Sequence, residues 1–331
     1  MECNFNYSEL KTYSGYYIDK NKLKESASGG AATVISENII KSGGCVFGIV
    51  YTNNFYEAEY YCAETLEELK KLKGSKYVET KKTITNDGKL CSVYDILENK
   101  LKLGKKVLYI GLGCDIGAVY KICENKNLDI SNLYTIELIC HGPTTKEVHS
   151  KYISELEEKF NSKIIDFTVK YKKVGWVPQY IHAEFENRKI YERPFAGSDY
   201  GVAFSIYTRK ACFNCKFRAD NHKADIVIGD YWGLQKDMPG YNEYGVSIMF
   251  VRNEKGDSLI KDIDDTIFSL QETSTKFALE NNKMYYKCRE KHQKYDAFEK
   301  NFKCKGLHYA VTYRDGFIKA VIRKIKNKLG R

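Results

Sequence analysis

A strand–helix–strand alternation in the middle of the chain constrains its fold more than any other feature. The run YDILENKLKLGKKVLYIGLG predicts a helix, a Gly-Lys turn and a buried strand at residues 107–110. AVYKICENK then predicts a second helix, and LYTIELIC predicts a second buried strand. Because apolar strands that alternate with helices are typical of layered α/β structures, we expect an α/β unit in this region.

The residues before this unit predict a smaller α/β unit. AATVISENIIK has apolar residues at helical spacing (Val34, Ile35 and Ile39) and stops at a Gly-Gly pair. CVFGIVYT predicts a strand, ETLEELKKL a short helix, and GSKYVET, residues 74–80, a polar loop. Up to about residue 20 the chain is rich in Tyr and shows no periodic pattern.

After the helix KEVHSKYISELEEKF the pattern changes to strands: IIDFTVKYK, QYIHAEFENRKIYERPF, ADIVIGDYW and VSIMFVRN. Their alternating polar and apolar residues favour antiparallel pairing, and from about residue 256 the chain reads as helical and polar. The expected class is therefore α/β (mixed α+β). It comprises a small N-terminal α/β unit over 1–100, a central α/β unit with added antiparallel strands over 101–262, and a helical region over 263–331.

Composition places the chain among soluble globular proteins, with 43% hydrophobic and 29% charged residues. No apolar run approaches the ~18 residues of a membrane span, and MECNFNYSELKTYSGYY lacks the pattern of a signal peptide, so we expect a cytoplasmic location. Residues 314–331 carry seven basic residues and one acidic residue. The rest of the chain is nearly balanced, which does not indicate nucleic-acid binding.

The C-terminal tail predicts an amphipathic helix with a basic face. Such a helix can lie on an anionic membrane surface, which would add peripheral contact with the inner membrane face, or it can dock on the protein body. Both readings stay open. The apolar residues at helical spacing are Phe317, Ile318, Val321, Ile322, Ile325 and Leu329.

Four of the eleven cysteines occupy chemically distinctive settings. Cys114 follows a predicted buried strand at the start of a helix, Cys140 ends the next strand, and Cys212-x-x-Cys215 lies among basic and aromatic residues. If the two strands are parallel neighbours, Cys114 and Cys140 lie at one sheet edge. Four thiolates can complete one metal centre, either an iron–sulfur cluster or zinc. The remaining cysteines considered are expected in the core: Cys45, Cys62, Cys91 and Cys123.

Two further patterns have competing readings. Gly111-x-Gly113-x-x-x-Gly117 resembles a dinucleotide-binding loop, but its last glycine is one residue late, and the acidic candidates Asp129 and Glu137 fall before and within the strand. A dinucleotide site of this kind is therefore disfavoured. His141 reads as a turn-capping side chain, a ligand or an acid/base group, and the turn after ADIVIGDYW as a packed tryptophan or as the wall of a cofactor pocket.

Several short motifs in a fixed order resemble the beta-subunit family of coenzyme F420 hydrogenase/dehydrogenase, over about residues 26–259. These motifs are SASGG, GGCVFGIVY, GSKYVET, KKVLYIGLGC, LICHGP, Gly175-Trp176, the Cys212/Cys215 pair, IGDYWG and GVSIMFV. The resemblance is to bacterial members associated with surface-polysaccharide synthesis.

This resemblance implies a flavin- and iron–sulfur-dependent oxidoreductase in which FAD lies beside a 4Fe–4S cluster. A ferredoxin-like or other electron-donor protein would supply electrons, and a small-molecule substrate, such as a sugar intermediate, would accept them. Residues 1–100 would be the flavin-binding N-terminal domain and 101–262 the domain with the cluster and flavin site; no residue is assigned as catalytic. The implied cluster ligands are Cys114, Cys140, Cys212 and Cys215. The implied FAD-binding residues are Ser28, Gly29, Gly30, Gly74, Ser75, Lys76, Tyr77, Asp230 and Trp232.

One motif departs from the family pattern. The family commonly has G-T-P-C-Q at the first cysteine, whereas this chain has Leu112-Gly113-Cys114-Asp115, which adds a negative charge next to the expected cluster. Two alternatives therefore accompany the prediction. One is a non-catalytic electron-transfer subunit, and the other is a zinc-stapled scaffold without redox function.

Overall fold

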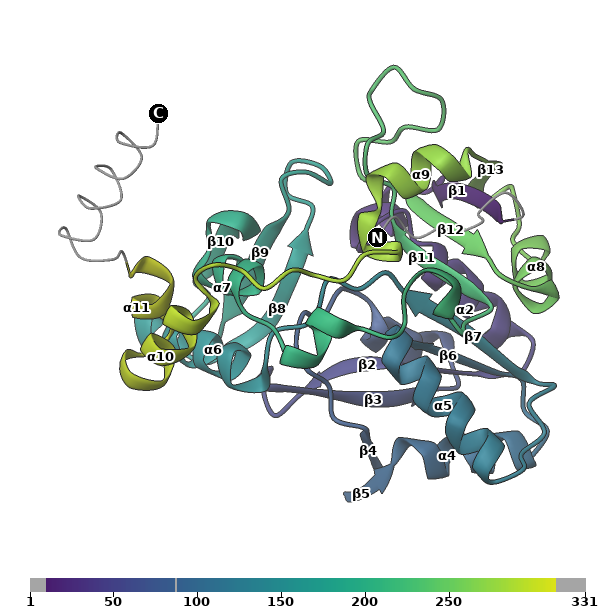
Figure 1. Ribbon diagram of the computed structural model, residues 1–331, viewed down its shortest axis with the longest axis horizontal. Coiled ribbons are helices and arrows are strands. Elements are labelled where there is room, and N and C mark those ends of the chain that lie inside the picture. The colour runs from purple at the N-terminus through teal and green to yellow at the C-terminus, as the bar shows by residue number, and fades with distance from the viewer. Residues whose placement is uncertain (1–9, 87, 314–331) are drawn as a thin grey trace.

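The computed structural model describes residues 10–86 and 88–313 (Figure 1). The predicted amphipathic tail lies outside these residues. The chain folds into a mixed α/β structure built on one eight-stranded sheet, with a smaller three-stranded sheet beside it and a two-stranded hairpin. This confirms the predicted fold class.

The large sheet has the strand order β13-β1-β12-β11-β7-β6-β2-β3. Its centre is parallel, because β2, β6, β7 and β11 run in one direction, and the remaining four strands pair antiparallel. The strand bounds are β1 Lys11–Tyr17, β2 Cys45–Thr52, β3 Glu57–Ala63, β6 Val107–Gly111, β7 Leu133–Leu138, β11 Ile226–Asp230, β12 Ser247–Val251 and β13 Phe268–Glu272.

The smaller sheet is the antiparallel set β8 (Ile164–Tyr171), β9 (Tyr180–Phe185) and β10 (Ile190–Pro194), while β4 (Thr83–Asn86) and β5 (Lys89–Ser92) form the hairpin. The α-helix bounds are α1 Lys20–Glu25, α2 Ala31–Lys41, α3 Leu66–Leu69, α4 Val93–Lys102, α5 Gly113–Asn125, α6 Lys146–Phe160, α7 Asp199–Ile206, α8 Glu254–Lys261, α9 Thr275–Asn281, α10 Tyr295–Lys305 and α11 Leu307–Thr312. None of the described helices is long and apolar enough to cross a membrane.

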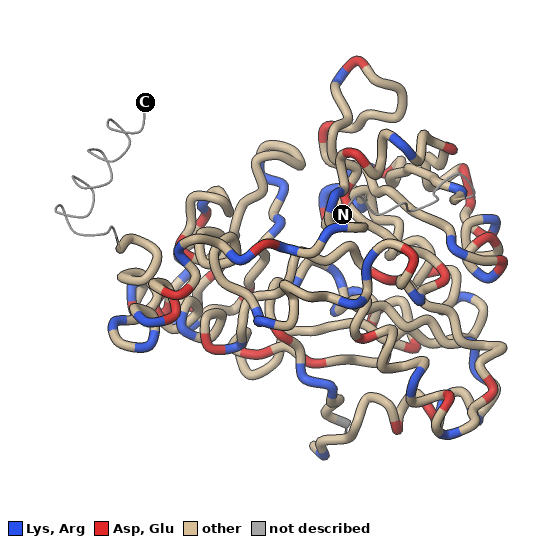
Figure 2. Tube along the Cα trace, in the orientation of Figure 1, with Lys and Arg blue, Asp and Glu red and all other residues tan. Residues whose placement is uncertain are grey.

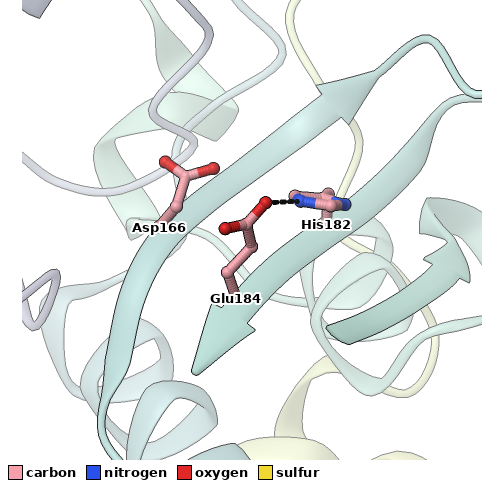
Figure 3. A group of neighbouring side chains, drawn as sticks. All are labelled: Asp166, His182 and Glu184. Atoms are coloured by element: carbon pink, nitrogen blue, oxygen red, sulfur yellow. Dashed lines mark hydrogen bonds and ion pairs between the residues drawn. The ribbon is translucent and has the colours of Figure 1, made fainter. Parts of the chain in front are cut away.

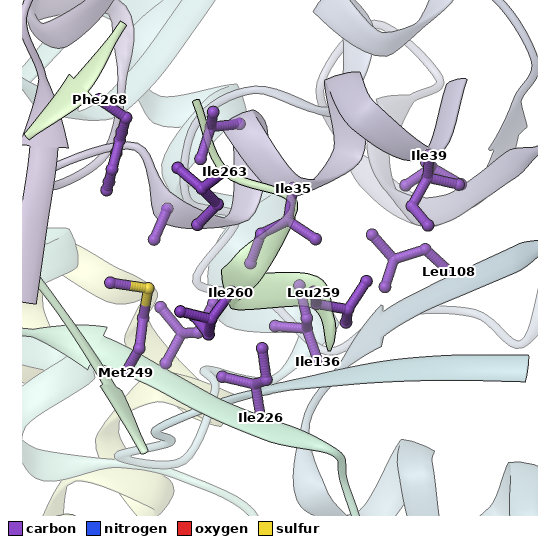
Figure 4. Packing of buried hydrophobic residues seen from close by; sticks show 14 of the residues in the cluster. Ile35, Ile39, Leu108, Ile136, Ile226, Met249, Leu259, Ile260, Ile263 and Phe268 are labelled. Carbon is purple, nitrogen blue, oxygen red and sulfur yellow. The ribbon is translucent and has the colours of Figure 1, made fainter. Parts of the chain in front are cut away.

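Alternating side chains on the parallel strands explain why helices cover both faces of the large sheet. Val46 and Leu108 belong to a buried cluster with residues of α2 and α8, whereas Phe47 and Tyr109 belong to one with residues of α4 and α5. Successive strand residues point to opposite faces, so both faces must be covered to bury these apolar side chains. Figure 4 shows the first cluster, in which Ile136 is fully buried.

The structure corrects three sequence-based expectations. The first 20 residues contain β1, and the region expected to be helical after residue 256 contains β13, which pairs with β1. β11 was expected in antiparallel pairing, but it is parallel to β7 on one side and antiparallel to β12 on the other. The apolar periodicity of the sequence did not predict β1, because two of its buried residues, Thr12 and Ser14, are polar.

The large sheet draws strands from all three predicted segments, because β1, β2 and β3 precede residue 100 and β13 follows residue 263. The segment boundaries therefore do not separate independent sheets. The division into family domains stays a prediction.

Candidate functional site

The site is built where the central parallel strands end. β6 ends at Gly111 and α5 begins at Gly113, so Cys114 lies in the first turn of that helix. β7 is the parallel neighbour of β6 and ends two residues before Cys140, and β11, the next parallel strand, ends at Asp230. Carboxyl ends of parallel strands meet at one edge of a sheet, where α/β proteins usually bind ligands. The structure thus confirms the parallel arrangement on which the grouping of Cys114 and Cys140 depends.

A glycine turn brings the Cys212 loop against Cys140. Gly142 has φ +95°, its N–H lies 3.2 Å from Cys140 Sγ, and a Cβ at this position would lie 3.4 Å from the Cys212 Cβ. Burial, together with the nearby Cys212 and Cys114, raises the pKa of Cys140 to about 12, despite the Gly142 N–H and Arg218. Cys114 and Cys212 are therefore close enough to Cys140 to influence its ionisation.

Three arginines surround the cysteines and are only partly paired. Arg209 approaches Cys114 Sγ at 4.0 Å, Arg218 donates to the Cys140 carbonyl oxygen, and Arg289 contacts His141 at 3.3 Å. Each retains one buried nitrogen without a hydrogen-bond partner: Nε of Arg209, Nε of Arg218 and Nη2 of Arg289. An unpaired buried donor costs about 1–3 kcal/mol, and more when charged. Three unpaired N–H donors around one set of thiols are what a bound anionic group with several hydrogen-bond acceptors would require.

The sulfur atoms are spaced more widely than a zinc site requires. Zn–S bonds of about 2.3 Å in tetrahedral geometry place neighbouring sulfurs about 3.8 Å apart. Within residues 10–86 and 88–313, the only group of at least three Cys, His, Asp or Glu ligand atoms lying within 4.8 Å of one another is Asp166, His182 and Glu184 (Figure 3). The cysteines do not form such a group.

The Asp166 group lies on β8 and β9, in the smaller sheet. Its histidine is already engaged, because His182 Nδ1 lies 3.1 Å from Glu192 and Nε2 lies 3.1 Å from Glu184. Asp166 itself is exposed. Ordinary hydrogen bonding therefore accounts for this arrangement.

A fifth cysteine, Cys288, lies at the site and was missed. Its Sγ donates to the carbonyl oxygen of Cys215 at 3.4 Å, and it precedes Arg289 in the chain. Its sequence context, Lys-Cys-Arg, shares the basic neighbours of the Cys212 loop, and that similarity was the available signal.

Asp115, the acidic residue that departs from the family motif, adds less negative charge to the site than the sequence suggests. The buried carboxylate forms an ion pair with Lys82 at 2.5 Å and accepts hydrogen bonds from Tyr60 and the Leu112 N–H. Lys82 therefore offsets the added charge. Glu137, the acidic residue considered for a dinucleotide site, is also buried, and its Oε1 lies 2.7 Å from His222 Nδ1.

A cavity of about 880 Å³ adjoins the cysteines. Cys140, His141 and Gly142 line it, so the turn after β7 separates the cysteine site from this space. Eight of the nine predicted cofactor residues also line it: Ser28, Gly30, Gly74, Ser75, Lys76, Tyr77, Asp230 and Trp232. Gly29 does not. A Cβ there would lie 2.1 Å from the Gly15 carbonyl oxygen, so Gly29 allows the turn to pack against β1.

Buried lysines support the cavity walls, and two of them were not predicted. Lys170 is 7% exposed and contacts both Asp230 carboxylate oxygens, at 2.8 and 2.6 Å. Lys172 donates to the carbonyl oxygens of Leu23 and Ser28, each at 2.7 Å, and burial lowers its pKa to about 7, aided by Lys170. Lys170 lies in β8 and Lys172 lies just beyond its end. Side chains two residues apart in a strand lie on the same face, so this spacing could have indicated that the two lysines share one polar environment.

Lys76, which was predicted, turns its ammonium towards the backbone of its own loop. Nζ donates to the carbonyl oxygens of Leu72, Lys73 and Gly74 at 3.0, 2.5 and 3.2 Å. Burial lowers its pKa to about 7. Lys76 therefore stabilises the loop that forms this wall.

Aromatic and neutral groups complete the cavity. Trp232 is 40% exposed and packs against Trp176, with ring centroids 4.4 Å apart. His141 stacks on Phe204 at 5.2 Å, and burial, with Arg289 and Arg218, lowers its pKa to about 4. The imidazole is therefore neutral at pH 7. It can donate or accept hydrogen bonds but does not supply a charge.

Comparisons with known proteins agree with this architecture. No curated protein matches the chain. A structure of the F420-reducing nickel–iron hydrogenase complex from Methanosarcina barkeri, studied by xenon derivatization, contains a chain with 16% identity and a TM-score of 0.53. The match covers 88% of this chain and 92% of that one, which shows a shared fold. The family model for the C terminus of the coenzyme F420 hydrogenase/dehydrogenase beta subunit matches residues 104–276. Because this match spans more than half of the residues, the chain belongs to the coenzyme F420 hydrogenase/dehydrogenase beta-subunit family.

Proposed function

We propose that this chain is an iron–sulfur flavoprotein oxidoreductase. Cys114, Cys140, Cys212 and Cys215 would hold a 4Fe–4S cluster, and the adjoining cavity would hold FAD. The observation that carries the proposal is the position of Cys140, which belongs to the cysteine site and also lines the cavity. Two redox groups held on either side of this turn would be close enough to exchange electrons.

The arginines and the sulfur spacing favour a cluster over zinc. A cluster held by four thiolates is anionic, and its sulfides accept hydrogen bonds, which answers the unpaired N–H groups of Arg209, Arg218 and Arg289. The thiols are also too widely spaced for a preformed zinc shell. Both observations argue against the zinc-stapled scaffold.

The cavity suits a dinucleotide cofactor in size and in the groups that it presents. Its volume lies within the roughly 300–1,000 Å³ of typical ligand pockets. The first residues of α2, Ala31 to Thr33, line it, and the N-cap Gly30 provides no side-chain hydrogen bond. The Ala31 N–H contacts Ser247 Oγ at 3.4 Å and the Thr33 N–H donates to the Gly30 carbonyl oxygen, so the positive end of the helix, rather than a set of free donors, favours a phosphate here. We therefore assign the pyrophosphate of FAD to the turn around Ser28 and Gly30, which Lys172 holds through the Ser28 carbonyl.

The other cavity residues would position the cofactor and a substrate. Flavin, when bound, supplies the conversion between single-electron and hydride chemistry. Lys170 fixes the Asp230 carboxylate at the end of β11, and Trp232 presents an accessible ring at the cavity wall. An aromatic face of this kind can stack on a planar or sugar ring.

The partners follow from the same assignment. The family is named for subunits, and the related fold from Methanosarcina barkeri comes from a hydrogenase complex, which supports a partner protein as electron donor. We propose a ferredoxin-like donor and a small-molecule acceptor, with a sugar intermediate of surface-polysaccharide synthesis as the substrate class. The protein would act in the cytoplasm, and its basic tail would suit contact with the inner membrane face.

Anaerobic purification followed by visible spectroscopy and iron, sulfide, zinc and flavin analysis tests this proposal. The expected result is about four irons and one FAD per chain, with absorption from both groups. Zinc in place of iron, with no flavin, would overturn it and support the scaffold.

A non-catalytic electron-transfer subunit is the second candidate, since the Methanosarcina barkeri structure is that of a complex. Purification from native cells distinguishes the two. A stoichiometric partner that alone turns over the substrate would support the subunit, whereas turnover by the isolated chain would support the enzyme.

A further inference from the structure

Two segments at the cysteine site carry a high density of positive charge. Residues 209–223 and 283–294 together hold ten Lys and Arg residues and two acidic residues. Outside these segments and residues 314–331, the chain is net negative. Positive charge in the described part of the chain is therefore concentrated around the cysteines.

The two segments pack against each other although 59 residues separate them in sequence. Arg218 donates to the Met284 carbonyl oxygen, and Cys288 Sγ contacts the Cys215 carbonyl at 3.4 Å. In Figure 1 the yellow-green segment between α9 and α10 crosses the green segment between α7 and β11. Figure 2 shows Lys and Arg along both segments. Both segments therefore carry basic residues in the region where they pack together.

The arginines and lysines of these segments face different environments. Arg218 and Arg289 are buried beside the thiols, at 7% and 6% exposure. The lysines are exposed, and we call them the lysine face: Lys210, Lys216, Lys223, Lys283, Lys287, Lys291 and Lys294.

Most of the lysine face is not neutralised by the protein itself. Among the described residues, only Lys291 of these seven has an ion-pair partner within 4.0 Å, namely Asp296 at 2.7 Å. Exposed lysines elsewhere often have acidic partners, such as Lys102 with Glu98 and Lys121 with Glu124. Unneutralised charges of one sign raise the local potential and steer oppositely charged partners towards it.

We propose that the lysine face docks an acidic protein that carries single electrons. Cys212 and Cys215 are half-buried and lie between Lys210 and Lys216 in the chain, so a docked carrier would be near the thiols. Electron-transfer complexes are typically small and transient, which suits a surface of unpaired lysines better than an apolar interface. This inference rests on the proposed function, because it requires a redox centre at these cysteines.

Charge reversal tests the docking surface. The variant Lys210→Glu/Lys216→Glu/Lys287→Glu is compared with the matched control Lys41→Glu/Lys189→Glu/Lys261→Glu, three exposed lysines outside the two basic segments. Reduced 2Fe–2S plant ferredoxin, which is acidic, is mixed with each purified holoprotein in a stopped-flow instrument, and bleaching in the visible range is followed.

We expect the second-order rate constant to fall about tenfold or more in the lysine-face variant and to lose most of its dependence on ionic strength. The control should stay within about twofold of the wild type. Excess dithionite should still reduce all three proteins completely, which shows that the redox centres of the variants are intact. Equal rates with ferredoxin in wild type and lysine-face variant would overturn the proposal.

Binding of oxidised ferredoxin, measured by calorimetry, separates this proposal from the proposed function. Protein without iron or flavin that still binds ferredoxin through the lysine face would overturn the redox assignment but support the surface. A lysine-face variant that loses affinity for duplex DNA or anionic vesicles, yet keeps its affinity for ferredoxin, would overturn the docking assignment alone.

Discussion

Two sets of cysteines lie in or beside the same central sheet and have opposite surroundings. Cys45 and Cys123, at 0% and 2% exposure, belong to an apolar cluster with Phe47 and Leu97 on the face covered by α4 and α5. The other set lies at the carboxyl edge of the parallel strands, beside three arginines with unpaired N–H groups. That set comprises Cys114, Cys140, Cys212, Cys215 and Cys288.

The contrast shows that neighbours, rather than residue type, give a cysteine its role. In the interior, a thiol packs as a small apolar side chain and leaves no polar group unpaired. At the edge, buried cations without full partners are costly unless an anionic group binds between them. The comparison therefore predicts that changes at the edge alter cofactor content, whereas changes in the interior alter stability.

The largest effect is expected at the edge. Cys140→Ser should reduce iron from about four to less than one atom per chain, because a neutral hydroxyl is a poor cluster ligand. Iron analysis and visible absorption after anaerobic purification measure this. Cys62→Ser, on β3 away from the arginines, is the control and should retain its iron. Iron loss in Cys62→Ser would show that the wrong cysteines are assigned.

In the interior, Ile136→Ala should destabilise the fold without removing iron from the folded protein. Ile136 is fully buried between β7 and the helices of the first cluster (Figure 4), and such truncations cost about 2–5 kcal/mol. Urea unfolding measures the loss. The control, Ile165→Ala, removes an isoleucine that is 55% exposed and should change stability by about 0.5 kcal/mol or less. Iron loss at unchanged stability would contradict the comparison.

A smaller effect is expected on the redox potential. Arg289→Gln removes a buried positive charge next to Cys140 and Cys212, which should lower the midpoint potential because reduction adds negative charge. Spectroelectrochemical titration measures this shift. Arg193→Gln, at an exposed position on β10, should leave the potential unchanged. Equal midpoint potentials in Arg289→Gln and wild type would show that the charge of Arg289 does not influence the redox centre.

A further effect concerns pH. Burial lowers the folded-state pKa of Lys172 from 10.5 to about 7, so between these values the unfolded chain holds a proton that the folded chain lacks. The unfolding free energy should therefore rise with pH across this window, and below pH 7 this lysine should contribute no slope. Lys172→Met should lose this lysine's share of that rise in urea unfolding between pH 7 and 9.5 and keep the share from Lys76, whose pKa burial also lowers to about 7, while the exposed control Lys189→Met should keep both. Parallel pH profiles of Lys172→Met and wild type would contradict the assignment.

Periodicity predicted the elements whose burial is apolar. The helices at 31–41 and 146–160 and the strands β2, β6 and β7 have strong apolar patterns and were located from sequence. β1 could not be located in this way, because its buried Thr12 is satisfied by a hydrogen bond to Thr275, far along the chain. The direction of β11 was likewise hidden, since a strand paired on both sides can run parallel to one neighbour and antiparallel to the other.

The candidate site was predicted only where short motifs mark it. The cysteine pair at 212 and 215 and the loops lining the cavity have recognisable local sequences. Cys288, Arg289 and Lys172 do not, because each is brought to the site by a separate segment. Their roles depend on which carbonyl groups and thiols lie next to them in space.

The sequence by itself determined the α/β class, the family and the cysteines expected to act together, because apolar periodicity and short motifs are local properties of the chain. The tertiary structure alone decided that β1 and β13 complete the sheet and that Cys140 lies between two sites. It also decided that Lys82 offsets Asp115 and that two distant basic segments pack together. These features depend on electrostatic and hydrogen-bonding partners far apart in sequence, and only the folded chain brings such partners within contact distance.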